Sequence, residues 1–177
     1  RLSLVRTNAR IRARVHTFIY LYIFMAKKTI ADLQEEARKK INPEIDPKEL
    51  LRLELLSSLE KYTKAMFKAQ YHRSFVVNKH HKQIFEALQD VVDGKCKRLI
   101  INMPPRYSKT EIAIKMFISW CFALNPVCRF LHLSYSDLLV NDNSATIRGI
   151  MMEPLYKTLF PNSVLEKEKG SSTRWKT

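Results

Sequence analysis

The stretch from residue 97 to residue 111 reads KRLIINMPPRYSKTE, and it decides the expected fold. Its apolar run, residues 99–101, is bounded by cations on one side and by a pair of prolines on the other, a pattern typical of a buried strand that ends abruptly. A helix is expected to begin near Thr110. The loop amides and the positive end of that helix would then face one small volume, where an anion binds well.

The loop partly fits the P-loop template G-x-x-x-x-G-K-[ST], because Lys109 and Thr110 occupy its last two positions. In that template the ammonium reaches the β- and γ-phosphates of a nucleotide and the hydroxyl binds Mg²⁺. Met103 and Ser108 replace the two glycines, and a Cβ in a strained turn costs on the order of 1 kcal/mol relative to glycine. The two prolines have no amide hydrogen to donate. The predicted phosphate cradle is therefore Arg106, Tyr107, Ser108, Lys109 and Thr110.

The alternative is an ordinary strand-to-helix turn with cations at the surface. The wider sequence bears on this choice: INMPPRYSKTE follows VVDGKCKRLI and precedes LHLSYSDLLVNDNSATIRGIM. Residues 75–177 thereby resemble the large subunit of the tailed-phage DNA-packaging terminase, in which the Walker A loop typically reads M-P-P-R-[HY]-[GS]-K-[ST]-E. The resemblance implies an α/β fold, a partial P-loop NTPase with a parallel sheet flanked by helices, preceded by N-terminal helices.

The resemblance also implies ATP and Mg²⁺ as cofactors. Lys109 would bind phosphate and Thr110 would be the metal ligand. Arg106 would offset the charge that develops on the γ-phosphate, so that Arg106 and Lys109 are the expected catalytic residues. The alternative for Arg106 is an ion pair with a nearby carboxylate such as Glu111.

A second part of the expected site lies at the start of a predicted helix over residues 79–92. The resemblance places His80, His81 and Gln83 near the adenine, and Gln83 is the expected cofactor-binding residue among them. A histidine pair or a glutamine at such a position is otherwise an ordinary surface feature. Both interpretations stay open from the sequence alone.

Other parts of an ATP-driven nuclease are missing from the sequence. A Walker B element would be an apolar strand that ends in two acids, which hold Mg²⁺ and position water. No such strand follows the second predicted strand, and the carboxylate cluster of the family's nuclease domain is absent as well. We therefore expect the chain alone to bind ATP weakly at best, without useful hydrolysis and without cutting DNA.

Length and composition fit one folded domain of 177 residues with 46% hydrophobic content. The formal net charge of +14 favours a polyanionic partner such as nucleic acid or an anionic membrane surface, and a solvated basic surface is the alternative. Three cysteines without a Cys-x-x-Cys pair support neither a disulfide framework nor a zinc site. Buried, reduced thiols are expected.

Three regions are expected along the chain. Residues 1–24 are rich in arginine and end in an apolar run that resembles a signal-peptide core or a short anchor, yet this run is shorter than the roughly 20 residues that a spanning helix needs. Because Met25-Ala26-Lys27-Lys28 resembles an initiation site, these residues are interpreted as translated upstream sequence. Residues 25–74 form a helical region, and residues 75–177 form an ATPase domain that ends before Walker B.

Hydrophobic periodicity and breakers predict the individual elements. Helices are expected over 27–41, 47–70, 79–92, 110–123, 137–152 and 155–160, and strands over 99–101, 129–135 and 172–177.

The function that the resemblance implies is the ATP-driven motor that packages double-stranded DNA into procapsids. Its implied partners are double-stranded DNA, the portal protein, the small terminase subunit and further copies of the chain in a ring. The expected location is the host cytoplasm, with no stable membrane association. The alternatives are another nucleic-acid-dependent P-loop ATPase, such as a helicase-like enzyme, and a non-enzymatic basic module that binds nucleic acid or a partner through residues 47–70.

Overall fold

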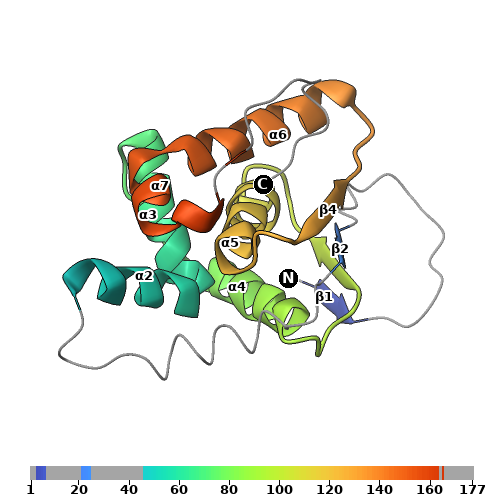
Figure 1. The fold of residues 1–177 in the computed structure, drawn as a ribbon. Coiled ribbons are helices and arrows are strands. Elements are labelled where there is room, and N and C mark those ends of the chain that lie inside the picture. Colours follow the sequence, from blue (N-terminus) through green and yellow to red (C-terminus); the bar gives the residue numbers. More distant parts are fainter. Residues whose placement is uncertain (1–2, 7–20, 25–45, 164, 166–177) are drawn as a thin grey trace.

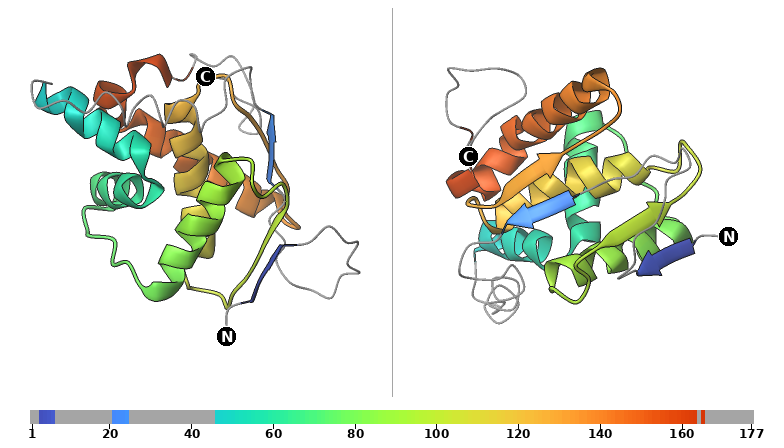
Figure 2. Two further views of the ribbon diagram at one scale, coloured as in Figure 1. Left: turned by 90° about the horizontal axis from the view of Figure 1, so that it is seen from below. Right: turned by 90° about the vertical axis from the view of Figure 1, so that its right-hand side faces the viewer.

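The computed structural model describes residues 3–6, 21–24, 46–163 and 165. This part of the chain is mostly helical, with its short strands gathered on one side of the helices (Figures 1 and 2). The helices are α2 (Pro47–Ser57), α3 (Leu59–Tyr71), α4 (Lys79–Val92), α5 (Phe117–Leu124), α6 (Asp137–Met152) and α7 (Pro154–Leu159), together with a π-helix, Glu111–Met116, and a 3-10 helix, Pro161–Ser163. The strands are β1 (Ser3–Arg6), β2 (Leu21–Phe24), β3 (Leu99–Asn102) and β4 (Arg129–His132).

The expected α/β fold with a parallel sheet is wrong. Strand β3 pairs antiparallel with β1, and β4 pairs antiparallel with β2, so the described residues hold two separate two-stranded pairs and no parallel sheet. Strands β3 and β4 lie where the sequence predicts strands, although β4 ends at His132 and not at residue 135. Each pairs with a strand from the N-terminal 24 residues, β1 or β2, which the sequence does not predict, and β3 and β4 do not pair with each other. Most of the core is formed by helices that pack against one another.

The centre of this core is one continuous helix that starts as the π-helix Glu111–Met116 and continues as α5. Every residue of α5 is buried, as expected for a helix that is apolar on nearly all sides. Its neighbours are helices: α5 contacts α2, α3 and α6, while the π-helix contacts α3, α4 and α6 (Figure 1). Burying one large apolar side chain such as that of Phe117 or Ile118 stabilises the fold by about 1.5–3 kcal/mol.

Hydrogen bonds through Ser119 fix this central helix to its neighbours. The hydroxyl of Tyr62 in α3 donates to Ser119 Oγ at 2.9 Å, and Ser119 Oγ lies 3.0 Å from the carbonyl oxygens of both Lys115 and Met116. The hydroxyl of Tyr156 in α7 donates to the carbonyl of Ser119 at 3.1 Å. All three side chains are fully buried, so these bonds satisfy polar groups that water cannot reach.

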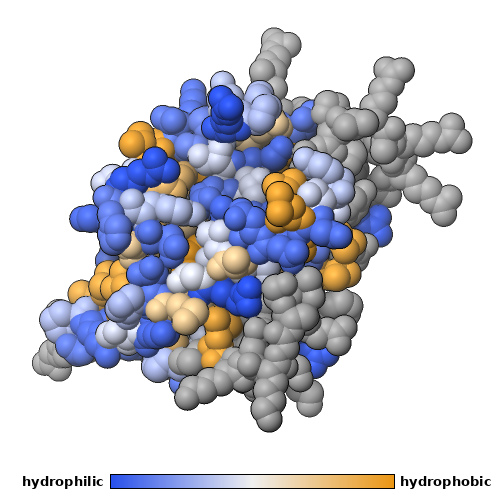
Figure 3. Space-filling view, turned by 90° about the horizontal axis from the view of Figure 1, so that it is seen from above, coloured by the Kyte–Doolittle hydropathy of each residue, from blue (hydrophilic) through white to orange (hydrophobic). Residues whose placement is uncertain are grey.

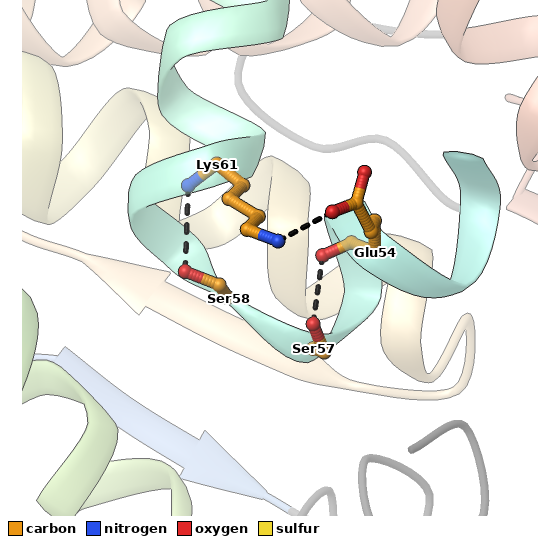
Figure 4. Close-up of polar contacts among 4 residues, drawn as sticks. All are labelled: Glu54, Ser57, Ser58 and Lys61. Atoms are coloured by element: carbon orange, nitrogen blue, oxygen red, sulfur yellow. Dashed lines mark hydrogen bonds and ion pairs between the residues drawn. The ribbon is translucent and has the colours of Figure 1, made fainter. Parts of the chain in front are cut away.

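Helix α2 is tied to the same helix by Trp120, whose indole nitrogen donates to the carbonyl of Leu55 at 3.0 Å. The sequence predicts one helix over residues 47–70, whereas the structure has two, α2 and α3, divided at Ser58. Ser58 takes an extended backbone conformation and its Oγ accepts the amide hydrogen of Lys61 at 3.4 Å (Figure 4). The Lys61 side chain returns to Glu54 and forms an exposed ion pair across the break between the two helices.

Most of the other predicted elements are confirmed. Helix α4 has the predicted bounds and ends at Asp93 and Gly94, where Gly94 adopts a φ of 72°. Helices α6 and α7 lie within one residue of their predicted limits. The predicted helix over 27–41 and the predicted strand over 172–177 lie outside the described residues.

The three cysteines are free and buried, as predicted. Burial raises the pKa of the Cys121 thiol well above its ordinary value and that of Cys128 to about 11. Among the described helices, none is long and apolar enough to cross a membrane. On the face drawn in Figure 3, hydrophobic side chains form small groups between hydrophilic ones.

Removing the Ser119 hydroxyl tests the role of the buried hydrogen bonds. Ser119→Ala leaves the buried Tyr62 hydroxyl without its acceptor, which is expected to lower the free energy of unfolding by about 1–3 kcal/mol. Adding Tyr62→Phe removes the orphaned hydroxyl, so the double variant should be less destabilised than the sum of the two single variants. Urea unfolding of all four proteins measures this. Strict additivity would show that the bond does not contribute as described.

Candidate phosphate-binding loop and adjoining pocket

The loop between β3 and the central helix has an unusual backbone. Arg106 has a φ of 68° and Ser108 a φ of 56°, both in the left-handed region that residues with a Cβ seldom adopt. Ser108 occupies the second glycine position of the P-loop template, so the chain bends there in the way that glycine allows. The first helical hydrogen bond follows at once, from the Ile112 amide to the Ser108 carbonyl at 3.0 Å.

Lys109 lies directly after this bend, and its side chain turns back over the loop. Its ammonium nitrogen lies 3.5 Å from the carbonyl oxygen of Met103, the residue at the first glycine position, whose own side chain is buried. Among the residues that the structure describes, Lys109 forms no ion pair with a carboxylate. The loop therefore holds a half-buried cation that no carboxylate of the described residues neutralises.

Arg106 is exposed and, within the described ranges, makes no ion pair either. The carboxylate of Glu111, its expected alternative partner, is engaged elsewhere. Glu111 accepts a hydrogen bond from the hydroxyl of Tyr71 at 2.9 Å and forms an ion pair with Lys115 at 3.3 Å. Burial, followed by the negative charge of Glu111, raises the pKa of Tyr71. The guanidinium of Arg106 thus stays at the surface of the loop.

An open pocket of about 410 Å³ adjoins the loop. It lies between the loop, the end of α3 and the start of α4, which brings together residues far apart in sequence. Its walls carry aromatic rings and two guanidinium groups. The lining residues are Phe67, Arg73, Ser74, Phe75, Val76, Asn78, His80, His81, Arg106, Tyr107 and Ser108.

The rings of the pocket wall form a row in which each ring contacts the next. Tyr107 of the loop meets His80 edge-on at 5.4 Å between centroids, His80 lies 3.9 Å from His81, and His81 lies 5.1 Å from Phe75. Burial lowers the pKa of His81, with a further contribution from His80, so its imidazole is neutral at pH 7. The loop and the base of α4 are therefore joined by a continuous set of aromatic contacts.

The structure brings most, but not all, of the predicted residues together. Arg106, Tyr107 and Ser108 line the pocket, and Lys109 and Thr110 follow on the partly buried start of the helix. Gln83, the residue expected near the adenine, is exposed on α4 and is not among the lining residues.

The pocket is also lined by Phe67, Arg73 and Phe75, which no motif in the sequence marks. The guanidinium carbon of Arg73 lies 5.4 Å from the centre of the Phe67 ring. Arg73 and Phe75 follow the turn at His72, where the chain leaves α3 with a φ of 54° and continues towards α4. No spacing rule in the sequence indicates such a turn.

The residues of the site provide few ligands for a metal ion. No group of three or more histidine, cysteine, aspartate or glutamate residues that could hold a metal occurs among the described residues. Mg²⁺ commonly keeps several waters and binds through one or two protein groups together with substrate phosphates. The Thr110 hydroxyl, partly buried beside the loop, fits that requirement only together with a phosphate ligand.

Comparisons of this chain with protein-family models, with curated proteins and with solved structures find no match. These comparisons therefore do not support the resemblance of residues 75–177 to the terminase large subunit, which rests on the sequence motifs.

The left-handed backbone at Ser108 leads to a prediction that a matched pair of variants can test. Ser108→Gly and Ser108→Ala both remove the hydroxyl, but only alanine keeps a Cβ in the strained position. The free energy of unfolding of the glycine variant should therefore be about 1 kcal/mol higher than that of the alanine variant.

The matching substitutions at Thr158, exposed within α7, serve as the control. There the order should reverse, since glycine in a helix is about 1 kcal/mol less favourable than alanine. Chemical denaturation of the four variants measures both differences. A more stable alanine variant at residue 108 would contradict the described loop geometry.

Proposed function

We propose that residues 106–110 bind the phosphates of ATP with Mg²⁺, and that the chain is the nucleotide-binding part of a DNA-packaging ATPase of the terminase large-subunit type. The observation that carries the proposal is the left-handed backbone at Ser108, the second glycine position of the P-loop template. Serine stands at this glycine position, and the backbone keeps the strained bend all the same. This is best explained if the loop needs the bend. Strain of this kind is found mainly at ligand-binding positions.

The charges of the loop support phosphate as the ligand. The Lys109 ammonium contacts a single carbonyl oxygen at 3.5 Å, a weak interaction that a phosphate oxygen can replace with a charge-assisted bond. Arg106 adds a second cation at the rim of the pocket. Amides at the start of the central helix add donors of fixed direction.

The adjoining pocket supports a nucleotide over free phosphate. Its volume of about 410 Å³ lies within the range of sites for small organic ligands, and aromatic rings form much of its wall. Because Arg106, Tyr107 and Ser108 line the pocket as well as the loop, one ligand can place its phosphates on the loop and its base among the rings.

The proposal rests on this loop and not on the overall fold. The described residues build a helical body without the parallel sheet that the resemblance implies. Hydrolysis also needs an acidic pair that holds Mg²⁺ and positions water, which the sequence does not supply. We therefore propose nucleotide binding with little turnover for this chain.

The proposed partners follow from the same resemblance. They are double-stranded DNA, the portal protein, the small terminase subunit and further copies of the chain. The net charge of +14 supports a polyanion such as DNA, since cations that contact phosphates provide affinity without sequence preference.

Thermal unfolding of the chain with and without Mg-ATP tests the proposal. A ligand at 100 times its Kd stabilises the folded state by about 2.7 kcal/mol, so the melting temperature should rise. Lys109→Ala should abolish this rise, because the phosphates lose their main cation. Lys157→Ala, which removes an exposed lysine from α7, should leave it unchanged. An equal rise in wild type and Lys109→Ala, or no rise in the wild type, would contradict nucleotide binding at this loop.

A further inference from the structure

Glu111 is the acidic residue closest in sequence to the phosphate loop, and the only one between Asp93 and Asp137. It follows Thr110 directly and lies in the first turn of the central helix. The amides at the N-terminus of a helix attract carboxylates as well as phosphates. An unrestrained Glu111 side chain would therefore compete with a bound phosphate for the amides and the cations of the loop.

Two side chains occupy the carboxylate of Glu111. Its Oε1 accepts a hydrogen bond from the hydroxyl of Tyr71 at 2.9 Å, and its Oε2 lies 3.3 Å from the ammonium nitrogen of Lys115. Lys115 is four residues further along the helix, away from the loop. The Glu111 side chain is only 17% exposed, so little water can replace either partner. Both carboxylate oxygens are thus bound by groups outside the loop.

The ring of Tyr71 is itself held in place. It packs on Phe67 at 4.6 Å between ring centroids, and the guanidinium carbon of Arg73 lies 5.9 Å from its centre. Burial, followed by the negative charge of Glu111, raises the pKa of Tyr71, so its hydroxyl keeps the proton that it donates. Because Tyr71 is the last residue of α3, this hydrogen bond joins the end of α3 to the start of the central helix.

Loss of the Tyr71 hydroxyl would leave one oxygen of Glu111 without its donor at a partly buried position, which is unfavourable for a charged group. Two cations, Arg106 and Lys109, lie within the five residues that precede Glu111. Neither forms an ion pair with a carboxylate among the described residues. A carboxylate drawn to either cation would neutralise the charge that attracts a phosphate and would repel the phosphate itself.

We infer that Tyr71 is a positioning residue of the phosphate loop, whose hydroxyl holds the Glu111 carboxylate away from the amides and cations that receive the phosphates. The inference rests on the proposed function, because it requires that a polyphosphate binds at residues 106–110. Tyr71 acts through Glu111 and not on the ligand.

Calorimetric titration of the full chain with tripolyphosphate tests the inference, because this ligand carries phosphates without a base. Tyr71→Phe should weaken binding about tenfold, the loss expected when one hydrogen bond to a charged group no longer restrains the carboxylate. Adding Glu111→Gln should restore the wild-type affinity, since a neutral amide neither pairs with the loop cations nor repels phosphate. The matched control Tyr156→Phe, which removes a buried hydroxyl that bonds to Ser119, should bind normally.

Rescue by the second substitution separates positioning of Glu111 from a merely structural role. Wild-type affinity in Tyr71→Phe, or a double variant that binds as weakly as Tyr71→Phe, would overturn the role of Tyr71. Glu111→Gln alone should bind at least as tightly as the wild type, and weaker binding would overturn the inference whether or not Tyr71→Phe folds. If the wild type binds no tripolyphosphate, the proposed function fails as well, whereas equal binding by wild type and Tyr71→Phe overturns the inference alone.

Discussion

Burial of the helix from Glu111 to Leu124 is the constraint on which the rest of the structure depends. Apart from Glu111 and Lys115, which are partly exposed, every residue of this helix is buried, and α2, α3, α4 and α6 pack around it. Tyr62 and Tyr156 bond to Ser119, and Trp120 bonds to the carbonyl of Leu55, which fixes the positions of the neighbouring helices. The first turn of the same helix begins directly after Ser108, so the core also determines where the loop lies.

Contacts on two sides hold the loop and the pocket in place. Glu111, at the start of the central helix, is held by Tyr71 from the end of α3. On the other side, the capping box of α4 orients His81, and His80 reaches Tyr107 of the loop. A phosphate on the loop and a base in the pocket would therefore be positioned by the same three elements. This arrangement explains why a strained backbone at Arg106 and Ser108 can persist: the surrounding contacts determine the path of the chain.

The sequence predicts local features well because their causes are local. Apolar periodicity and the break at Asp93 and Gly94 define α4, and the all-round apolar pattern correctly indicates a buried central helix. Pairing between strands depends on residues that are distant in sequence. Because β3 and β4 pair with strands from the N-terminal 24 residues, the prediction of a parallel sheet is wrong. The motif predicts that loop residues 106–108 belong to the site, whereas Arg73 and Phe75 reach the pocket after a turn at His72 that no motif marks.

If the bent loop at Ser108 is a phosphate cradle, its backbone amides should respond to a bound polyphosphate, and nuclear magnetic resonance of the ¹⁵N-labelled chain measures this. Titration with tripolyphosphate reports on each backbone amide without any substitution. We expect the largest shifts at the amides of residues 106–110, while amides of α6, such as that of Gly149, remain unchanged. Shifts spread over lysines and arginines across the surface, with none concentrated at the loop, would contradict it.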